Sequence, residues 1–241
     1  MSTDIIRQDP AYSRLLDLRE RATTLPFKKF PLNRAPESEL APSFLIARYD
    51  GGVGASTAAS MLALFVDNPL FVQIGGNASR AFQGLPKEDL LSFPFDDPDR
   101  FDNAFDARLE HASRPAFIEF EQTLYREAIT ATCILRGDRF HSSATLIFVA
   151  SPDDEKIKYR ILAEKAGIDD LIVLGAPQVQ KESRAGVIRI PTLPKEIASA
   201  FYTHGKTLPE AIRSCPGLFS IAKLEQDLRE FNHKILERLQ S

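Results

Sequence analysis

The expected fold of this chain is decided by the stretch Phe44-Leu45-Ile46-Ala47-Arg48-Tyr49-Asp50-Gly51-Gly52-Val53-Gly54-Ala55-Ser56-Thr57. Its apolar start predicts a strand, and the run after it, Ala58 to Phe65, predicts a helix. A strand, a glycine loop, a hydroxyl pair and a helix follow one another in this order in phosphate-binding loops. Such a loop normally has a lysine directly before the hydroxyl pair, and here that position is Ala55. The sequence therefore predicts a nucleotide-binding fold without its main phosphate cation.

Composition restricts the classes of protein that this chain resembles. Hydrophobic residues at 44% and charged residues at 26% are ordinary for a soluble globular protein. The formal net charge of -3 disfavours tight non-specific binding of nucleic acid by the whole surface. No apolar run approaches the length of a membrane span, and the first residues lack an apolar export signal. Cys133 and Cys215 stand far apart in the sequence, and neither belongs to a Cys-x-x-Cys or Cys/His cluster. This indicates reduced thiols, so a cytoplasmic location is expected.

Two parts of the chain differ in character. Residues 1–40 are expected to form an N-terminal arm, with one amphipathic helix over Tyr12–Thr24 and a proline-rich linker after it. Lys28, Lys29 and Arg34 make the linker basic, so it is either a solvated tether or a contact for a partner or a nucleic acid backbone. Residues 41–241 are expected to form the main domain.

The main domain alternates short apolar runs with longer helical patterns. This alternation predicts an α/β fold of the doubly wound kind, with a mostly parallel sheet and helices on both faces. The expected strands are Phe44–Arg48, Leu70–Ile74, Ala116–Phe120, Thr145–Ala150, Leu171–Leu174 and Val187–Ile190. The expected helices are Ser56–Val66, Phe101–Ala112, Glu121–Leu135, Glu155–Ala166, Lys195–Tyr202 and Leu218–Leu239.

The glycine loop retains several means of holding an anion. Its glycines allow a close backbone approach, and the helix that starts near Ser56 directs its positive end at the same place. Losing one charge-assisted hydrogen bond of roughly 1.5–3 kcal/mol weakens binding by about one to two decades. Weak nucleotide binding and its complete loss therefore both remain open. The predicted nucleotide-contacting residues are Gly51, Gly52, Val53, Gly54, Ala55, Ser56 and Thr57.

Residues 50–57, Asp50-Gly51-Gly52-Val53-Gly54-Ala55-Ser56-Thr57, resemble the deviant Walker A motif, K-G-G-x-G-K-S/T-S/T, of the ParA/MinD family of P-loop ATPases. The resemblance fails at both lysines, which are Asp50 and Ala55 here. In that family the first lysine reaches across a nucleotide-sandwich dimer. An acid in its place would repel the phosphates of a partner.

The family resemblance also implies roles for residues outside the loop. Glu119, at the end of its strand, stands near the place of the family's Walker B aspartate, as a weak catalytic candidate. Ser56 and Glu119 would then hold Mg²⁺, and Pro191 would lie near the nucleotide base. The strand Leu70–Ile74 lacks the acid that the family has after it. Glu119 and Glu121 are expected to face opposite ways unless the strand stops between them, which argues against a carboxylate pair for acid–base work.

Two functions follow from this pattern. The favoured one is a pseudo-ATPase that keeps the scaffold and serves as a protein-binding module, with ATP and Mg²⁺ bound weakly or not at all. The alternative is an active but slow ATP-dependent dimerisation switch that positions a plasmid or a conjugation, secretion or pilus machine. Either one implies protein partners in a bacterial partition, conjugation, secretion or envelope assembly, and a homodimer remains open. A nucleic acid partner is not favoured.

Overall fold

The computed structural model describes residues 40–48, 52, 54–76, 79–137, 140, 142–150, 163–176 and 186–240. The expected N-terminal arm and most of the expected helix Glu155–Ala166 lie outside this part of the chain. Leu40, which the expected boundary assigns to the arm, is buried in the core of the main domain. None of the described helices combines the length and the apolar character that a membrane crossing needs.

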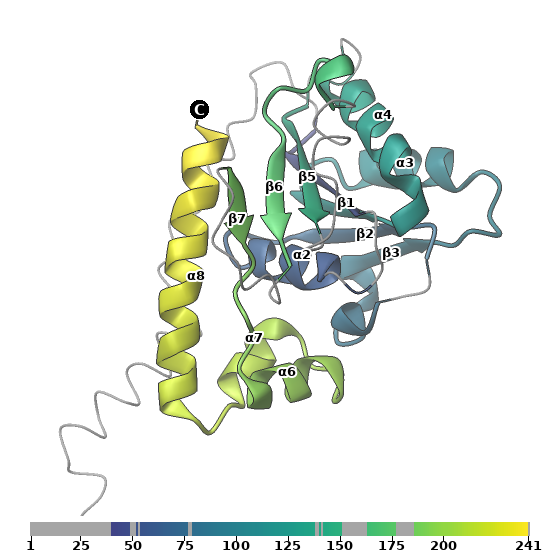
Figure 1. Ribbon diagram of the computed structural model, residues 1–241. Coiled ribbons are helices and arrows are strands. Elements are labelled where there is room, and N and C mark those ends of the chain that lie inside the picture. The colour runs from purple at the N-terminus through teal and green to yellow at the C-terminus, as the bar shows by residue number, and fades with distance from the viewer. Residues whose placement is uncertain are drawn as a thin grey trace, which may run out of the picture.

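The described strands form one sheet in which every neighbouring pair is parallel. Their order across the sheet is β3-β2-β4-β1-β5-β6-β7, so the strand before the glycine loop lies in the middle. This is the α/β architecture that the sequence predicted (Figure 1). The strands are β1 (Ser43–Arg48), β2 (Leu70–Ile74), β3 (Leu90–Phe93), β4 (Ala116–Phe120), β5 (Ala144–Ala150), β6 (Ile172–Gly175) and β7 (Val187–Arg189).

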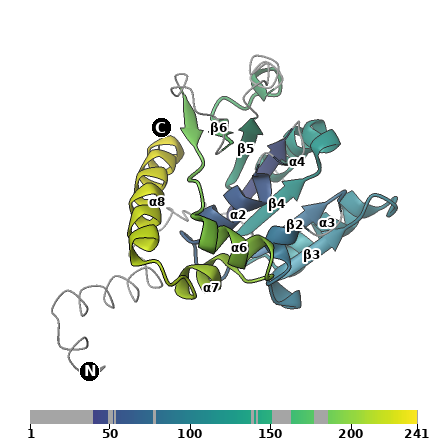
Figure 2. The ribbon, with the colours of Figure 1, turned by 60° about the horizontal axis from the view of Figure 1, so that its bottom comes forward.

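Helices cover both faces of this sheet. One face packs against α2 (Ala55–Ala63), α6 (Lys195–Tyr202), α7 (Leu208–Arg213) and α8 (Leu218–Leu239). The other packs against α3 (Arg100–Glu110) and α4 (Tyr125–Arg136). Figure 2 shows α6 and α7 together beside one end of α8. Three short 3₁₀ turns complete the described elements: η2 (Arg80–Phe82), η3 (Lys87–Asp89) and η4 (Gln122–Leu124).

The sequence pattern missed β3 and α7, and it placed the start of α4 too early. β3 is a four-residue edge strand with only half-buried or exposed residues, so it lacks the continuous apolar run that marks the central strands. α7 has six residues and begins with a capping box between Thr207 and Glu210. Glu121 keeps extended backbone angles and is followed by η4, which delays α4 until Tyr125.

The core beneath α2 contains a row of phenylalanine rings that crosses three strands. Phe44 of β1 stacks on Phe117 of β4, with 4.9 Å between ring centroids. Phe117 lies 5.8 Å from Phe71 of β2, and Phe71 lies 5.1 Å from Phe82 of η2. Because β2, β4 and β1 are parallel neighbours, their carboxyl ends meet at one edge of the sheet. After β1 the chain leaves towards β2 over one face, whereas after β4 it leaves towards β5 over the other. Ligands of such sheets bind at this kind of switch point.

Candidate functional site

The glycine loop follows β1 at this edge and ends where α2 begins. Gly52 and Gly54 have positive φ angles of 75° and 90°, which residues with side chains rarely adopt. Gly54 is also the N-cap of α2, and no side chain caps this helix end. The two described glycines of the loop thus have positive φ angles, and the start of α2 is not capped by a side chain. Asp50, Gly51 and Val53 lie outside the described residues.

Ser56 and Glu119, for which the family resemblance implies a shared metal ion, lie next to each other. Ser56 is in the first turn of α2, and Glu119 of β4 is in register with Ile46 of β1. The Ser56 hydroxyl donates a hydrogen bond of 2.9 Å to Oε1 of Glu119, and both side chains are buried. They meet because β4 lies directly beside β1.

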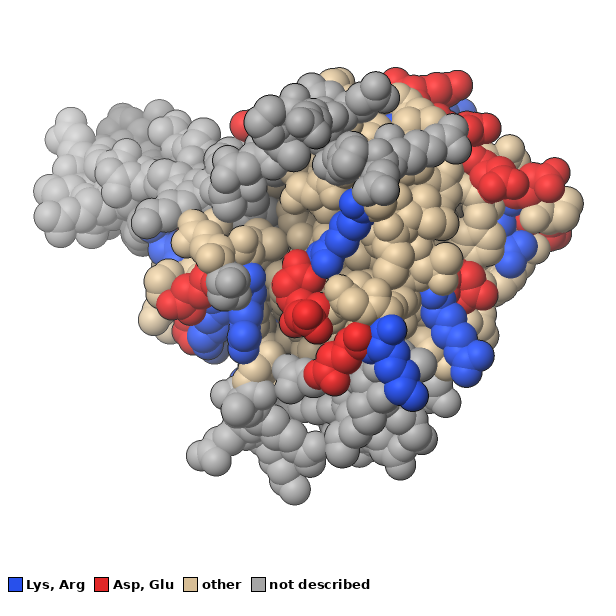
Figure 3. Space-filling view, turned by 90° about the horizontal axis from the view of Figure 1, so that it is seen from above, with Lys and Arg blue, Asp and Glu red and all other residues tan. Residues whose placement is uncertain are grey.

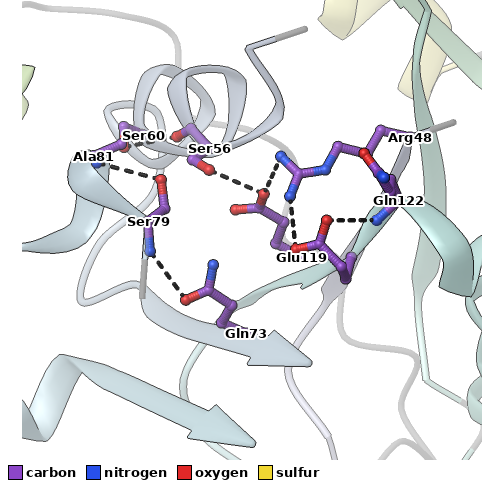
Figure 4. A network of polar contacts seen from close by, with 9 residues as sticks. Arg48, Ser56, Ser60, Gln73, Ser79, Ala81, Glu119 and Gln122 are labelled. Atoms are coloured by element: carbon purple, nitrogen blue, oxygen red, sulfur yellow. Dashed lines mark hydrogen bonds and ion pairs between the residues drawn. The ribbon is translucent and has the colours of Figure 1, made fainter. Parts of the chain in front are cut away.

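Arg48, the last residue of β1, brings a positive charge to this pair. Its Nη1 lies 3.0 Å from Oε1 of Glu119, and its Nη2 lies 3.1 Å from Oε2 of Glu121. The Arg48 side chain is only 13% exposed and that of Glu119 only 1%. One guanidinium therefore joins the ends of β1 and β4 through two carboxylates, as Figure 4 shows for the labelled Arg48 and Glu119. The sequence reasoning missed this role, although a lone arginine that closes a buried apolar strand is a visible signal.

The expectation that Glu119 and Glu121 face opposite ways excepted a strand that stops between them, and β4 does stop between them. Residues two apart in a strand point to the same face, so their carboxylates start on one side of the sheet. β4 ends at Phe120, and Glu121 continues with extended angles of φ -61° and ψ 155°. Both carboxylates consequently reach Arg48, which makes them partners of one cation.

The backbone that follows β2 lies close to the carboxylate of Glu121. A Cβ atom at Gly76 would lie 2.5 Å from Oε2 of Glu121, so a side chain at this position would require the Glu121 carboxylate to shift. Gln73 of β2 is in register with Glu119, and its Oε1 accepts a hydrogen bond of 3.2 Å from the Ser79 backbone N–H. β2 thus places the side-chain amide of Gln73 beside Glu119. The acid that the ParA/MinD family has after this strand has no counterpart in the sequence.

Glu119 is a costly residue in its charged form. Burial raises the pKa of Glu119 above its usual value of 4.5, and the Arg48 charge and the Ser56 hydrogen bond counter this rise without cancelling it. Its Oε2 and the Nε of Arg48 are buried, and neither has a hydrogen-bond partner among the described residues. The charged form of this carboxylate therefore depends on the guanidinium beside it.

Thr57 connects the first turn of α2 to the C-terminal helices. Its hydroxyl is hydrogen-bonded to that of Tyr202, the last residue of α6. The ring of Tyr202 lies against the buried ring of Phe201, with 4.8 Å between centroids. Burial raises the pKa of Tyr202, so its hydroxyl keeps its proton at neutral pH. Both hydroxyls of the loop motif are therefore bonded to other side chains.

The remaining predicted nucleotide residues lie apart from this polar network. Ala55, at the lysine position, is fully buried in the apolar core between α2 and the sheet. Pro191 is buried just after β7, the third strand along the sheet from β1. No described interaction makes Pro191 part of the network around Glu119.

The Ser56 hydroxyl and Oε1 of Glu119, which the motif assigns to Mg²⁺, are bonded to each other, and Arg48 pairs with the same oxygen. Mg²⁺ prefers oxygen ligands, and Ser56 and Glu119 are the oxygen donors that the loop motif implies. The Ser56 hydroxyl hydrogen and an Arg48 nitrogen both point at the same Glu119 oxygen. A metal ion at this oxygen would face a guanidinium, and a triphosphate would face two carboxylates without a lysine. Across the described residues, no group of three or more His, Cys, Asp or Glu side chains could hold a metal ion.

No protein-family model matches the chain, and no curated protein sequence matches it.

Proposed function

We propose that this chain is a pseudo-ATPase: a ParA/MinD-like scaffold that works in the cytoplasm as a protein-binding module without a nucleotide cycle. The supporting scaffold features are a central β1, a glycine loop with two positive φ angles, and a carboxylate of the adjacent strand bonded to Ser56. Its partners are proteins of a bacterial partition, conjugation, secretion or envelope assembly. Any homodimer forms without nucleotide.

One observation supports the proposal that the chain neither binds nor hydrolyses a nucleotide. Arg48, the last residue of the strand before the loop, is bonded to two carboxylates, and the lysine position is a core alanine. Phosphoryl transfer depends almost entirely on positioning and on positive charge around the phosphates. Because the positive charge of Arg48 is already balanced by Glu119 and Glu121, little positive charge remains to bind a triphosphate or to accelerate its hydrolysis.

A titration with a fluorescent ATP analogue and Mg²⁺ tests this proposal. Fluorescence anisotropy reports binding, and light scattering on the same samples reports molecular mass. We expect no binding at millimolar nucleotide and no change in mass. Saturable binding accompanied by a doubling of mass, or hydrolysis at the rate of an ordinary P-loop ATPase, would overturn it.

Restoring the lysine sharpens the same test. Ala55→Lys returns the missing cation to the loop, but it also places a charged side chain at a buried position, so a loss of stability is expected. Ala58→Lys, at another fully buried alanine of the same helix, is the matched control for that loss. A gain in nucleotide affinity for Ala55→Lys alone shows that the loop kept its phosphate-binding form.

The ATP-dependent dimerisation switch remains the second candidate because of one feature of α2. Its first turn contains no acid, and no side chain caps it, so its positive end is available to an anion. In that case Ser56 and Glu119 would hold Mg²⁺, and Glu119 would orient the water. The nucleotide titration separates the two functions directly.

Binding to nucleic acid receives little support from the surface. Figure 3 shows acidic and basic side chains interspersed over one face of the molecule, without a continuous basic area among the described residues drawn there. The basic linker residues Lys28, Lys29 and Arg34 lie outside the described part of the chain. A protein partner is the better match to a surface of mixed charge.

A further inference from the structure

The contacts of Arg48 differ from those of an ordinary surface ion pair. The guanidinium is almost buried, it ends a central strand, and its two terminal nitrogens reach carboxylates of Glu119 and Glu121. The Ser56 hydroxyl completes the group by donating to the same Oε1 that accepts from Arg48. Parts of β1, of β4 with the turn after it, and of α2 are therefore held together around one positive charge.

A bound divalent cation does similar work in a phosphate-binding loop, because it draws the hydroxyl and the carboxylate towards one centre. Here the protein supplies the positive charge from its own chain. Glu119 explains why a charge is needed: a carboxylate that is only 1% exposed is strongly disfavoured unless a cation lies beside it.

We infer that the Arg48 guanidinium is the resident cation of this site, and that it replaces the metal ion in holding β1, β4 and the first turn of α2 together without any ligand. The inference deepens the proposed function and rests on it, because a scaffold with its own cation needs no nucleotide to keep its edge ordered. Arg48 is a positioning residue in this account, since it acts through Glu119 and Glu121.

The experiment removes the guanidinium and asks whether a metal ion takes over. Thermal unfolding midpoints are measured for the wild type, Arg48→Ala, Arg48→Lys and the double variant Arg48→Ala with Glu119→Gln. Each protein is measured in millimolar MgCl₂, in millimolar MnCl₂ and in NaCl of equal ionic strength, without nucleotide. Isothermal titration with Mn²⁺ on the same proteins gives the affinity directly.

Four results are expected. The wild-type midpoint is the same in all three salts. Arg48→Ala has a lowered midpoint that rises in the divalent salts, and it binds Mn²⁺ about tenfold or more tightly than the wild type, a gain of the size expected for removing one adjacent positive charge. Arg48→Lys keeps most of the midpoint and does not respond to the divalent salts. The double variant also shows no response, because the carboxylate that needs the cation is gone.

Several results would overturn the inference. One is an equal effect of divalent salt on the wild type and Arg48→Ala, and another is an unchanged midpoint for Arg48→Ala. If Arg48→Ala folds only in a divalent salt, the inference is supported, whereas failure to fold in any of the three salts contradicts it. Because no nucleotide is present, this test is separate from the proposed function: ATP binding by the wild type would overturn that function and leave these four results as they are.

Discussion

The two edges of the sheet use arginine in different ways. At the amino edge, Arg108 donates to the Ala41 carbonyl at 2.6 Å and Arg114 donates to the Pro69 carbonyl at 2.7 Å. These carbonyls lie just before β1 and β2. At the carboxyl edge, the contacts of Arg48 go to two carboxylates.

This difference in contacts indicates which property of arginine matters at each edge of the sheet. An amino-edge guanidinium satisfies backbone oxygens where strands begin, so its fork of donors matters. Arg136 makes both kinds of contact: its Nε donates to the Ala144 carbonyl at the start of β5 at 2.7 Å, and its two terminal nitrogens pair with the exposed Asp170 carboxylate. Arg48 mainly balances negative charge, so at the carboxyl edge the charge matters more than the fork. Evidence for a functional site therefore comes from the carboxyl edge.

The largest effect is expected from removing the carboxyl-edge charge. Arg48→Ala leaves Glu119 buried without its cation, which should lower the free energy of unfolding by about 3–5 kcal/mol. Chemical denaturation in urea gives the value. The control is Arg48→Met combined with Glu119→Gln, which removes both charges and should recover most of the loss. A cost below about 1 kcal/mol for the single variant would place Arg48 with ordinary surface pairs.

An intermediate effect is expected at the amino edge. Arg114→Ala removes donors to the backbone oxygens of Asn68, Pro69 and Glu88 and also the ion pair with Asp89, at a cost of about 1–3 kcal/mol. Lysine is the sharper comparison, measured by the same denaturation. Arg48→Lys should keep more than half of the stability that Arg48→Ala loses. Arg114→Lys should keep less than half of what Arg114→Ala loses, because a lysine can pair with Asp89 but cannot serve all three backbone oxygens. Equal rescue at both positions would erase the distinction between the edges.

The dependence of stability on pH should have opposite signs at Glu119 and Glu210. The pKa of Glu119 is raised in the folded protein, so its contribution is fully present below the usual value of 4.5 and is lost as pH rises through the folded pKa. The hydrogen bonds of Thr207 lower the pKa of Glu210, so that contribution is present above 4.5 and is lost as pH falls.

Denaturation of the Gln variants across a pH series measures both signs. Relative to the wild type, Glu119→Gln should gain stability as the pH is raised from about 4.5. Relative to the wild type, Glu210→Gln should lose stability as the pH is raised from acid values up to about 4.5, and the difference should stay constant above that pH. If the stability of both variants relative to the wild type changed in the same direction with pH, burial would not be the dominant influence on the pKa of Glu119.

The smallest effect is expected at the link between the loop helix and α6. Tyr202→Phe removes the hydroxyl that bonds to Thr57 and keeps the ring against Phe201, so about 0.5–1.5 kcal/mol should be lost. Amide hydrogen exchange should become faster in the first turn of α2 and stay unchanged in α3, which packs on the other face of the sheet. Unchanged exchange in α2 would show that the hydroxyl pair does not restrain the loop helix.

The fold was largely predictable from the sequence because the central strands are buried on both faces. Runs such as Leu70–Ile74 and Ala116–Phe120 are apolar enough that their boundaries were predicted to the residue. The edge strand Leu90–Phe93 is packed on fewer sides, so its sequence carries no comparable pattern. The long helix Leu218–Leu239 was predicted in full because its apolar spacing continues over many turns.

The candidate site was predictable only in part. The loop glycines and the adjacency of Ser56 and Glu119 follow from a motif and from strand order. The role of Arg48 depends on which side chains converge beyond the ends of β1 and β4, and no local spacing encodes that. Tyr202 was also out of reach, because its contact with Thr57 spans 145 residues of chain.

The most direct test of the central claim compares the thermal midpoint of the wild-type protein in saturating Mg²⁺·ATP with that in EDTA alone. A ligand that binds the folded state raises stability by about 2.7 kcal/mol at a hundred times its dissociation constant, which is easily seen as a shift of the midpoint. A site closed by its own guanidinium predicts identical midpoints in the two buffers. A clear rise in Mg²⁺·ATP would contradict the account, because the edge of the sheet would then still take a nucleotide.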